Sequence, residues 1–319
     1  MKKLLLVGLR YHDYTAAIID EISRLGYEVT YHEIQPRTLY LKTLKVASPK
    51  AWQASLDEHH RQIVQRESGT RYDCVLFIQA HQFSGENMRA LREQQRQARF
   101  VLYNWDSIAT HDYRLHLGCF DQVYTFDPDD AATLGVGYLP LFCVRAFQDL
   151  QQRDQQDRCV YFVGNIVSVQ RYEALSAFKQ HCAKEGIHLR SFMACSPLVY
   201  TRLLRAGHMP ADVSFRSIPQ AQFVDMIERS TTVFDFANHR QAGYTMRIFE
   251  NLCARKKIIT NNARILREPF YFEDRIHVFE GLDFSGVKRF VQRDLAVPGQ
   301  RFEQFHVQSF VRTLLGTTA

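Results

Sequence analysis

The sequence lacks several patterns that would assign it to a common protein class. Its seven cysteines form no CxxC pair, which argues against structural zinc and predicts reduced thiols in a reducing compartment. No apolar run approaches the length of a membrane span, and residues 4–9 are too short for a signal-peptide core. We therefore expect a soluble, cytoplasmic protein whose N-terminus is a buried strand.

Motifs for common cofactors, metals and nucleic acids are also missing. Neither GxGxxG nor GxxxxGK[ST] follows a predicted strand, so the usual nicotinamide and ATP clefts are disfavoured. The basic residues are scattered, so nucleic acid is not an expected partner. The net charge of +6 fits an anionic small substrate or an anionic membrane surface. Asp127-Pro128-Asp129 has the spacing of a DxD metal motif, but it stands at the start of a predicted helix. We therefore expect Asp127 to be the N-cap of that helix.

What the chain does contain is a regular alternation of short apolar runs and amphipathic helical patterns. It opens with a strand (3–8), a helix (14–25), Gly26 and a second strand (27–31). This order is a βαβ unit and predicts a parallel sheet. Further strands of the first half are predicted at residues 74–78, 100–104 and 122–126, with a helix at 87–97.

The second half repeats this architecture after a polar stretch, residues 146–158, that predicts a linker. A strand (159–164), a helix (172–185), Gly186 and a strand (187–192) come first. Later strands are predicted at 232–236, 257–260 and 276–279, with helices at 220–229, 246–254 and 302–315. We therefore predict an α/β protein with two Rossmann-like domains, 1–150 and 158–300, that face across a cleft, and a C-terminal helix (301–319) that packs toward the first.

Ligands of open parallel sheets bind at the carboxyl ends of the strands. Gly8 and Gly164 each end the first strand of a predicted domain, where a glycine lets the backbone turn tightly or approach a ligand. A simple turn glycine explains either position equally well. Asn165 follows Gly164 at the same strand end and is a candidate for donor binding with it.

The segment 243–250 is the most informative. Gly243 and Tyr244 precede a predicted helix whose first turn holds Thr245 and Arg247, so free N–H groups and a guanidinium are available for phosphate oxygens. Glu250 lies on nearly the same helix face and can accept hydrogen bonds from both hydroxyls of a ribose. The same spacing also fits an Arg–Glu pair on a solvated face.

Residues 244–250 (Tyr-Thr-Met-Arg-Ile-Phe-Glu), continued at 256–261, resemble bacterial polysaccharide and lipopolysaccharide biosynthesis glycosyltransferases with two Rossmann-like domains (GT-B type). Residues 103–107, 120–121, 124–130 and 139–142 resemble the first-domain signature of that group. The resemblance covers about residues 70–265 and implies a nucleoside-diphosphate-sugar donor in the second domain. It also implies a glycan or lipid-linked acceptor near the first, and with a lipid-linked acceptor, peripheral association with the inner membrane face. No cofactor is implied.

Asp106 follows a predicted strand of the first domain and is a candidate general base for the acceptor hydroxyl. It could equally hold a loop or contact the donor. His12, His81 and His111 lie near strand ends and are alternative bases. We expect no metal, because a helix end and Arg247 can offset the charge of the leaving group. A glycerol-phosphate-type transferase or a non-catalytic nucleotide- or glycan-binding module remains open.

Overall fold

The computed structural model describes residues 1–11, 13–36, 38–150, 158–237 and 243–317. They form two compact units. Unit 1 contains Met1–Arg145, residues 243–244 and residues 304–317, and unit 2 contains the described parts of Ala146–His239 together with Thr245–Glu303. Most of the predicted linker (151–157) lies outside the described residues.

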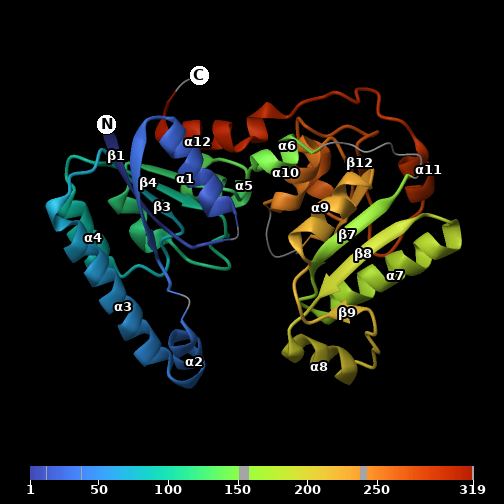
Figure 1. Cartoon of the computed structure of the whole chain (residues 1–319), viewed down its shortest axis with the longest axis horizontal. Coiled ribbons are helices and arrows are strands. Elements are labelled where there is room, and N and C mark those ends of the chain that lie inside the picture. The colour runs from blue at the N-terminus through green and yellow to red at the C-terminus, as the bar shows by residue number, and fades with distance from the viewer. Residues whose placement is uncertain (12, 37, 151–157, 238–242, 318–319) are drawn as a thin grey trace. The chain divides into compact units, whose positions relative to one another are not determined.

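Unit 1 is built on a parallel six-stranded sheet in the order β2-β1-β3-β4-β5-β6 (Figure 1). Its strands are β1 (Lys2–Gly8), β2 (Tyr27–Glu33), β3 (Cys74–Ile78), β4 (Arg99–Asn104), β5 (Gln122–Thr125) and β6 (Gly137–Tyr138). The central strands read as continuous apolar runs because both faces of the sheet are buried. The strand order reverses at β1, which lies between β2 and β3, so β1 and β3 flank the switch point where such sheets bind ligands.

The helices of unit 1 are α1 (Tyr14–Arg24), α2 (Leu39–Ala47), α3 (Pro49–Arg66), α4 (Gly85–Gln94), α5 (Pro128–Leu134) and α12 (Val307–Leu315). Sequence analysis assigned no element to residues 39–66. Two signals for α3 are present, however: the Ser48 side chain accepts a hydrogen bond from the backbone N–H of Ala51, and Pro49 occupies the first turn.

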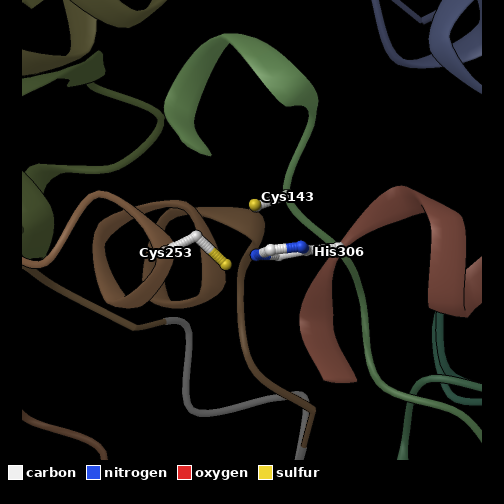
Figure 2. A group of neighbouring side chains, drawn as sticks. All are labelled: Cys143, Cys253 and His306. Atoms are coloured by element: carbon white, nitrogen blue, oxygen red, sulfur yellow. The ribbon is translucent and has the colours of Figure 1, made fainter. Parts of the chain in front are cut away.

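The C-terminal helix α12 completes the core of unit 1. Its Phe310 packs edge-on against Tyr103 of β4, with ring centroids 4.7 Å apart. The chain enters α12 through a parallel bridge between Cys143 and His306, where the Cys143 N–H donates to the carbonyl of Phe305 at 2.7 Å. Figure 2 shows the side chains of Cys143 and His306 at this bridge.

Unit 2 contains a second parallel sheet, in the order β12-β11-β10-β7-β8-β9. Its strands are β7 (Val160–Asn165), β8 (Leu189–Ala194), β9 (Val213–Ser214), β10 (Thr232–Asp235), β11 (Lys257–Thr260) and β12 (Ile276–Val278). Its helices are α6 (Arg145–Gln148, which starts at the last residue of unit 1), α7 (Val169–Glu185), α8 (Pro197–Arg205), α9 (Gln220–Glu228), α10 (Met246–Cys253) and α11 (Val287–Gln292). Phe178 of α7 stacks on Phe234 of β10 at 3.9 Å in the core. The predicted α/β class with two parallel sheets is thus confirmed.

Several predicted boundaries differ from those of the structure. Helix α7 begins at Val169, three residues before the predicted start, because Ser168 caps it. Helix α12 begins only at Val307, after a short 3-10 turn at Glu303–Phe305. Strand β8 begins at Leu189, two residues late. None of the described helices combines the length and the apolar character that crossing a bilayer requires.

Candidate functional site

In unit 2, Arg247 lies in the first turn of α10 and reaches back to the carboxyl ends of the central strands. Its Nη2 donates a hydrogen bond to the carbonyl oxygen of Val163 in β7, and its Nη1 lies 3.6 Å from Oδ1 of Asp235, the last residue of β10. The guanidinium also covers the ring of Phe162, 5.3 Å from its centroid. Since these contacts hold the side chain over the strand ends, Arg247 does not belong to a solvated surface pair.

A second arginine, Arg171, lies beside Arg247 and was missed by sequence analysis. It occupies the first turn of α7, and its Nη1 donates to the carbonyl of Phe236 at 2.9 Å. Its Nε is buried and makes no hydrogen bond in the described part of the chain. Burial, and next the positive charge of Arg247, lower the pKa of Arg171 to about 10. An orphaned guanidinium N–H beside a second cation is the arrangement that an anionic ligand would complete.

Gly164 is the residue that makes room for both arginines. A Cβ added at Gly164 would lie 3.1 Å from Nη2 of Arg247 and 3.6 Å from Nη2 of Arg171. It would also lie 3.0 Å from the ring of Phe162. The missing side chain of Gly164 therefore lets both guanidinium groups pack closely over the end of β7. Its predicted donor role stays a prediction.

Asp235 orients Arg247 and was also missed by sequence analysis. Its carboxylate is buried and accepts hydrogen bonds from the hydroxyls of Thr245, at 3.4 Å, and Thr260, at 3.2 Å. Thr245 is the N-cap residue of α10, yet its side chain makes no capping bond. The first N–H groups of α10 are therefore left without a side-chain cap, and the helix dipole adds positive potential at the same strand ends.

Glu250 is 6% exposed and lies one turn after Arg247 in α10. Its negative charge contributes to raising the pKa of Tyr161, whose main cause is burial. Tyr161 donates to Oδ1 of Asn251 at 2.7 Å, and Asn251 donates to the carbonyl of Arg247 at 2.8 Å. Glu250 is thus part of the buried polar layer under Arg247. Its predicted contact with a ribose stays a prediction.

Asn165 lines a pocket of about 340 Å³ at the carboxyl ends of β7, β8 and β9. The pocket offers polar groups from Asn165, Ser196 and Ser217 and one aromatic face, Phe215. Its volume is in the range of pockets that hold small organic ligands. Because Asn165 directly follows Gly164, this pocket adjoins the backbone that the two arginines face.

Gly243 and Tyr244, both predicted to bind the donor, belong to unit 1 rather than to the sheet that carries Arg247. A Cβ added at Gly243 would lie 2.3 Å from the ring of Phe126 and 2.9 Å from its carbonyl oxygen, so close packing requires a glycine here. The Gly243 N–H also lies within 3.4 Å of Oδ2 of Asp127. Tyr244 is buried. Packing within unit 1 thus accounts for Gly243 without a ligand.

Asp127 caps helix α5 as predicted. Its Oδ1 accepts hydrogen bonds from the backbone N–H groups of Asp129 and Asp130, at 3.0 and 3.3 Å. Gly8 packs against β3 at the end of β1, where an added Cβ would lie 3.1 Å from Ile78. Both positions have structural reasons of their own, and the proposed donor contact of Gly8 stays a prediction.

Three of the four predicted base candidates meet at the carboxyl ends of β3 and β4. The rings of His81 and His111 stack in parallel, 3.9 Å apart. His111 Nε2 lies 3.9 Å from Oδ2 of Asp106, and the side-chain amide of Gln79 donates a hydrogen bond to the same carboxylate oxygen. The fourth candidate, His12, lies outside the described residues.

Burial and solvent exposure differ among the base candidates of this cluster. Burial, and next the charge of His111, lower the pKa of His81 to about 4, so His81 is neutral near pH 7. Asp106 keeps 30% of its side chain exposed and is accessible to an incoming hydroxyl. Asp130 holds the loop that carries His111, because its Oδ2 accepts from the Ile108 N–H at 2.7 Å.

Buried polar atoms at and near these strand ends have no hydrogen-bond partner in the described residues. They are Oε1 of Gln79 and Nδ2 of Asn104 at the strand ends, and Nδ1 of His116 in the 3-10 turn Arg114–Cys119. Gln79 also adopts φ +65°, which is uncommon for a residue with a side chain. Buried polar groups are usually satisfied, so these atoms indicate that a polar ligand or water completes the site.

No protein-family model matches this chain, and no curated protein sequence matches it. Three solved structures similar to it are an α-glucosyltransferase in complex with UDP and mismatch-containing DNA, the lipopolysaccharide outer core galactosyltransferase WaaB, and a putative UDP-N-acetylglucosamine 2-epimerase from Listeria monocytogenes. Their identities to the chain are 10%, 12% and 8%, with TM-scores of 0.63, 0.58 and 0.59. Each match covers 99% of this chain and 96%, 98% or 95% of the other. This likeness shows that the chain has the two-Rossmann-domain GT-B fold.

Proposed function

We propose that this protein is a glycosyltransferase that uses a nucleoside-diphosphate sugar. The observation that carries the proposal is the pair Arg171 and Arg247 over Gly164, where one buried guanidinium N–H is unpaired. Asp235 pairs with Arg247, whereas the one hydrogen bond of the Arg171 side chain in the described residues goes to a backbone carbonyl. Both guanidinium groups lie beside the uncapped start of α10, and a diphosphate supplies the acceptors that Arg171 lacks.

The neighbouring pocket supports a nucleoside as the rest of the donor. Phe215 offers a face for a base, and Asn165, Ser196 and Ser217 offer hydrogen bonds. In the solved neighbours, UDP is bound by the α-glucosyltransferase, and the epimerase is named for a UDP-sugar. Because one fold serves a transferase and an epimerase, the reaction has to be argued from the residues.

The polar cluster of unit 1 supports transfer to an acceptor hydroxyl. In this reaction the acceptor oxygen bonds to the anomeric carbon, and the bond from that carbon to the phosphate oxygen breaks. The acceptor proton passes to Asp106, and the nucleoside diphosphate leaves with its negative charge held by Arg171 and Arg247. No metal is needed for this charge, because the guanidinium groups and the α10 N-terminus oppose it.

We further propose a glycan or lipid-linked acceptor in bacterial surface polysaccharide synthesis, at the inner face of the membrane. The resemblance of residues 244–250 and 256–261, and of the short segments between 103 and 142, to that group of enzymes supports this role. WaaB, which shares the fold, is named for lipopolysaccharide. A nucleic-acid acceptor is not proposed, because the chain has no dense basic block.

The donor is tested by thermal-shift measurements with UDP, GDP, CDP, TDP and CMP. A nucleotide that binds the folded state raises the apparent melting temperature by mass action. A diphosphate that stabilises the wild type but not Arg171→Ala or Arg247→Ala supports the proposal. No stabilisation by any of the five nucleotides would refute the donor site. With the donor known, mass spectrometry of products separates transfer from epimerisation, since an epimerase changes the sugar without an acceptor.

A further inference from the structure

The helices α2 and α3 meet at an apex that has an unusual composition. Between Glu33 and Asp57 the chain has four basic residues, Arg37, Lys42, Lys45 and Lys50, and no acidic one. We call the residues 43–52 the α2–α3 apex. Figure 1 shows α2 and the start of α3 beyond the strands of unit 1. The apex therefore presents positive charge with no acidic residue within its own segment to offset it.

The apex also exposes apolar atoms. Val46 is 87% exposed, and Ala47, Pro49 and Ala51 beside it are exposed too. The ammonium group of Lys45 lies over the indole ring of Trp52, 4.9 Å from its centroid. Lysines that surround small apolar residues and a tryptophan are typical of segments that rest in the headgroup region of a bilayer.

The C-terminal half of α3 is joined to the strand edge that carries the Asp106 cluster. Nε2 of His59 and Nε2 of His60 lie 2.7 and 2.8 Å from the carbonyl oxygens of Glu33 and Ile34, which end and follow β2. The ring of His60 stacks on Phe83, 4.3 Å away, in the loop that follows β3. The charge of Lys45 also contributes to the lowered pKa of His81. The apex and the proposed acceptor site thus lie on one edge of unit 1.

We propose that the α2–α3 apex docks unit 1 on the surface of an anionic lipid bilayer. Lys45 and Lys50 contact the headgroups, and Val46 and Pro49 enter the interface. This inference rests on the proposed function, because docking would bring the strand ends that carry Asp106 close to a lipid-linked acceptor. A nucleic acid would use the lysines but would gain nothing from Val46, so exposed apolar residues at the apex favour a bilayer.

The test is co-sedimentation of the full chain with vesicles of phosphatidylcholine, with and without 30% phosphatidylglycerol. The wild type should bind the anionic vesicles alone and should be released by 0.5 M NaCl. Each lysine at an anionic surface contributes about fivefold to binding, so Lys50→Glu, which reverses a charge, should weaken it about 30-fold. Val46→Gln should weaken it several-fold without a change in charge.

Arg66→Glu is the matched control, because it reverses an exposed charge at the other end of α3. The 18 residues of α3 span roughly 25 Å, well beyond the Debye length of about 8 Å. Arg66→Glu should bind within twofold of the wild type. No binding by the wild type, equal binding of Lys50→Glu and Arg66→Glu, or competition by DNA with no effect of Val46→Gln would overturn the proposal. Nucleotide affinity, measured by calorimetry on the same variants, tests the donor site separately, since those residues belong to unit 2.

Discussion

Replacing Arg171 by alanine is the sharpest test of the donor site, because sequence analysis gave this residue no role. Its guanidinium makes one hydrogen bond, to Phe236, and its Nε is buried without a partner in the described structure. Its pKa of about 10 keeps it charged at pH 7.5. A diphosphate oxygen would take the unused donor in a charge-assisted bond, which contributes about 1.5–3 kcal/mol.

The expected loss of nucleotide affinity follows from the strength of that bond. Removing that bond should raise the dissociation constant for the nucleoside diphosphate about 10- to 150-fold. Arg171→Lys should recover only part of the affinity, because an ammonium group keeps the charge but not the planar fork. Repulsion from Arg247 disappears in Arg171→Ala, so the unliganded protein should lose little stability.

Isothermal titration calorimetry measures the affinity, and Arg229→Ala is the control. Arg229 also lies in unit 2 and forms an ion pair with Asp225, but it is exposed at the C-terminal end of α9. Arg229→Ala should bind nucleotide like the wild type. If Arg171→Ala binds as tightly as Arg229→Ala while its circular dichroism spectrum is unchanged, the two-arginine site does not hold the diphosphate.

Four further outcomes are expected. Asp106→Asn should keep donor affinity and stability while turnover falls about 10²–10⁴-fold. A simultaneous loss of stability would indicate that Asp106 holds its loop. A product that retains the anomeric configuration of the donor would argue against Asp106 as the base. Transfer should persist in EDTA, and rescue of a lost activity by Mg²⁺ or Mn²⁺ would contradict the electrostatic assignment. His60 is fully buried, and burial lowers its pKa from 6.5 to about 4. Between these two pH values the unfolded state binds a proton that the folded state does not bind. The contribution of neutral His60 to the free energy of unfolding is therefore present above pH 6.5 and is lost as the pH falls toward 4. Denaturant titrations should show that the free energy of unfolding falls by about 3 kcal/mol from pH 7 to pH 4. His60→Gln should reduce this dependence on pH. Gly243→Ala places a Cβ 2.3 Å from Phe126 and should cost about 1–3 kcal/mol of stability, visible as a lower melting temperature; an unchanged value would mean that the loop shifts freely.

Local patterns were sufficient wherever one physical cause dominated. Strand β3 matches the predicted range 74–78 because a strand buried on both faces reads as a continuous apolar run. Strand β11 also matches its predicted range, 257–260, around two adjacent isoleucines. Asp127 was identified as a cap because a carboxylate before Pro128 bonds the free N–H groups of the next turn. Both signals depend on neighbours in sequence, so the sequence alone contains them.

The candidate site depended on distant residues, so sequence analysis recovered only part of it. Arg247 was found because a glycine and a helix start precede it, whereas Arg171 lies 76 positions earlier, directly before the predicted helix 172–185, in no pattern that indicates a ligand. Only the parallel order of β7 and β10 brings the two arginines and Asp235 to one strand edge. The predicted ligand contact of Gly243 stays a prediction, whereas its close packing against Phe126 is a long-range contact that no local pattern could indicate.

The sequence by itself determined the α/β class, most strand positions and the individual polar residues that end the strands, because hydrophobic periodicity and capping act over a few residues. Only the tertiary structure decided which of those residues meet. The stacking of His81 on His111 beside Asp106, and the sharing of Gly164 by two arginines, arise from strand order and register. Strand order and register set the distances between residues that are far apart in the chain. They therefore determine the chemistry that the side chains at each strand edge can perform.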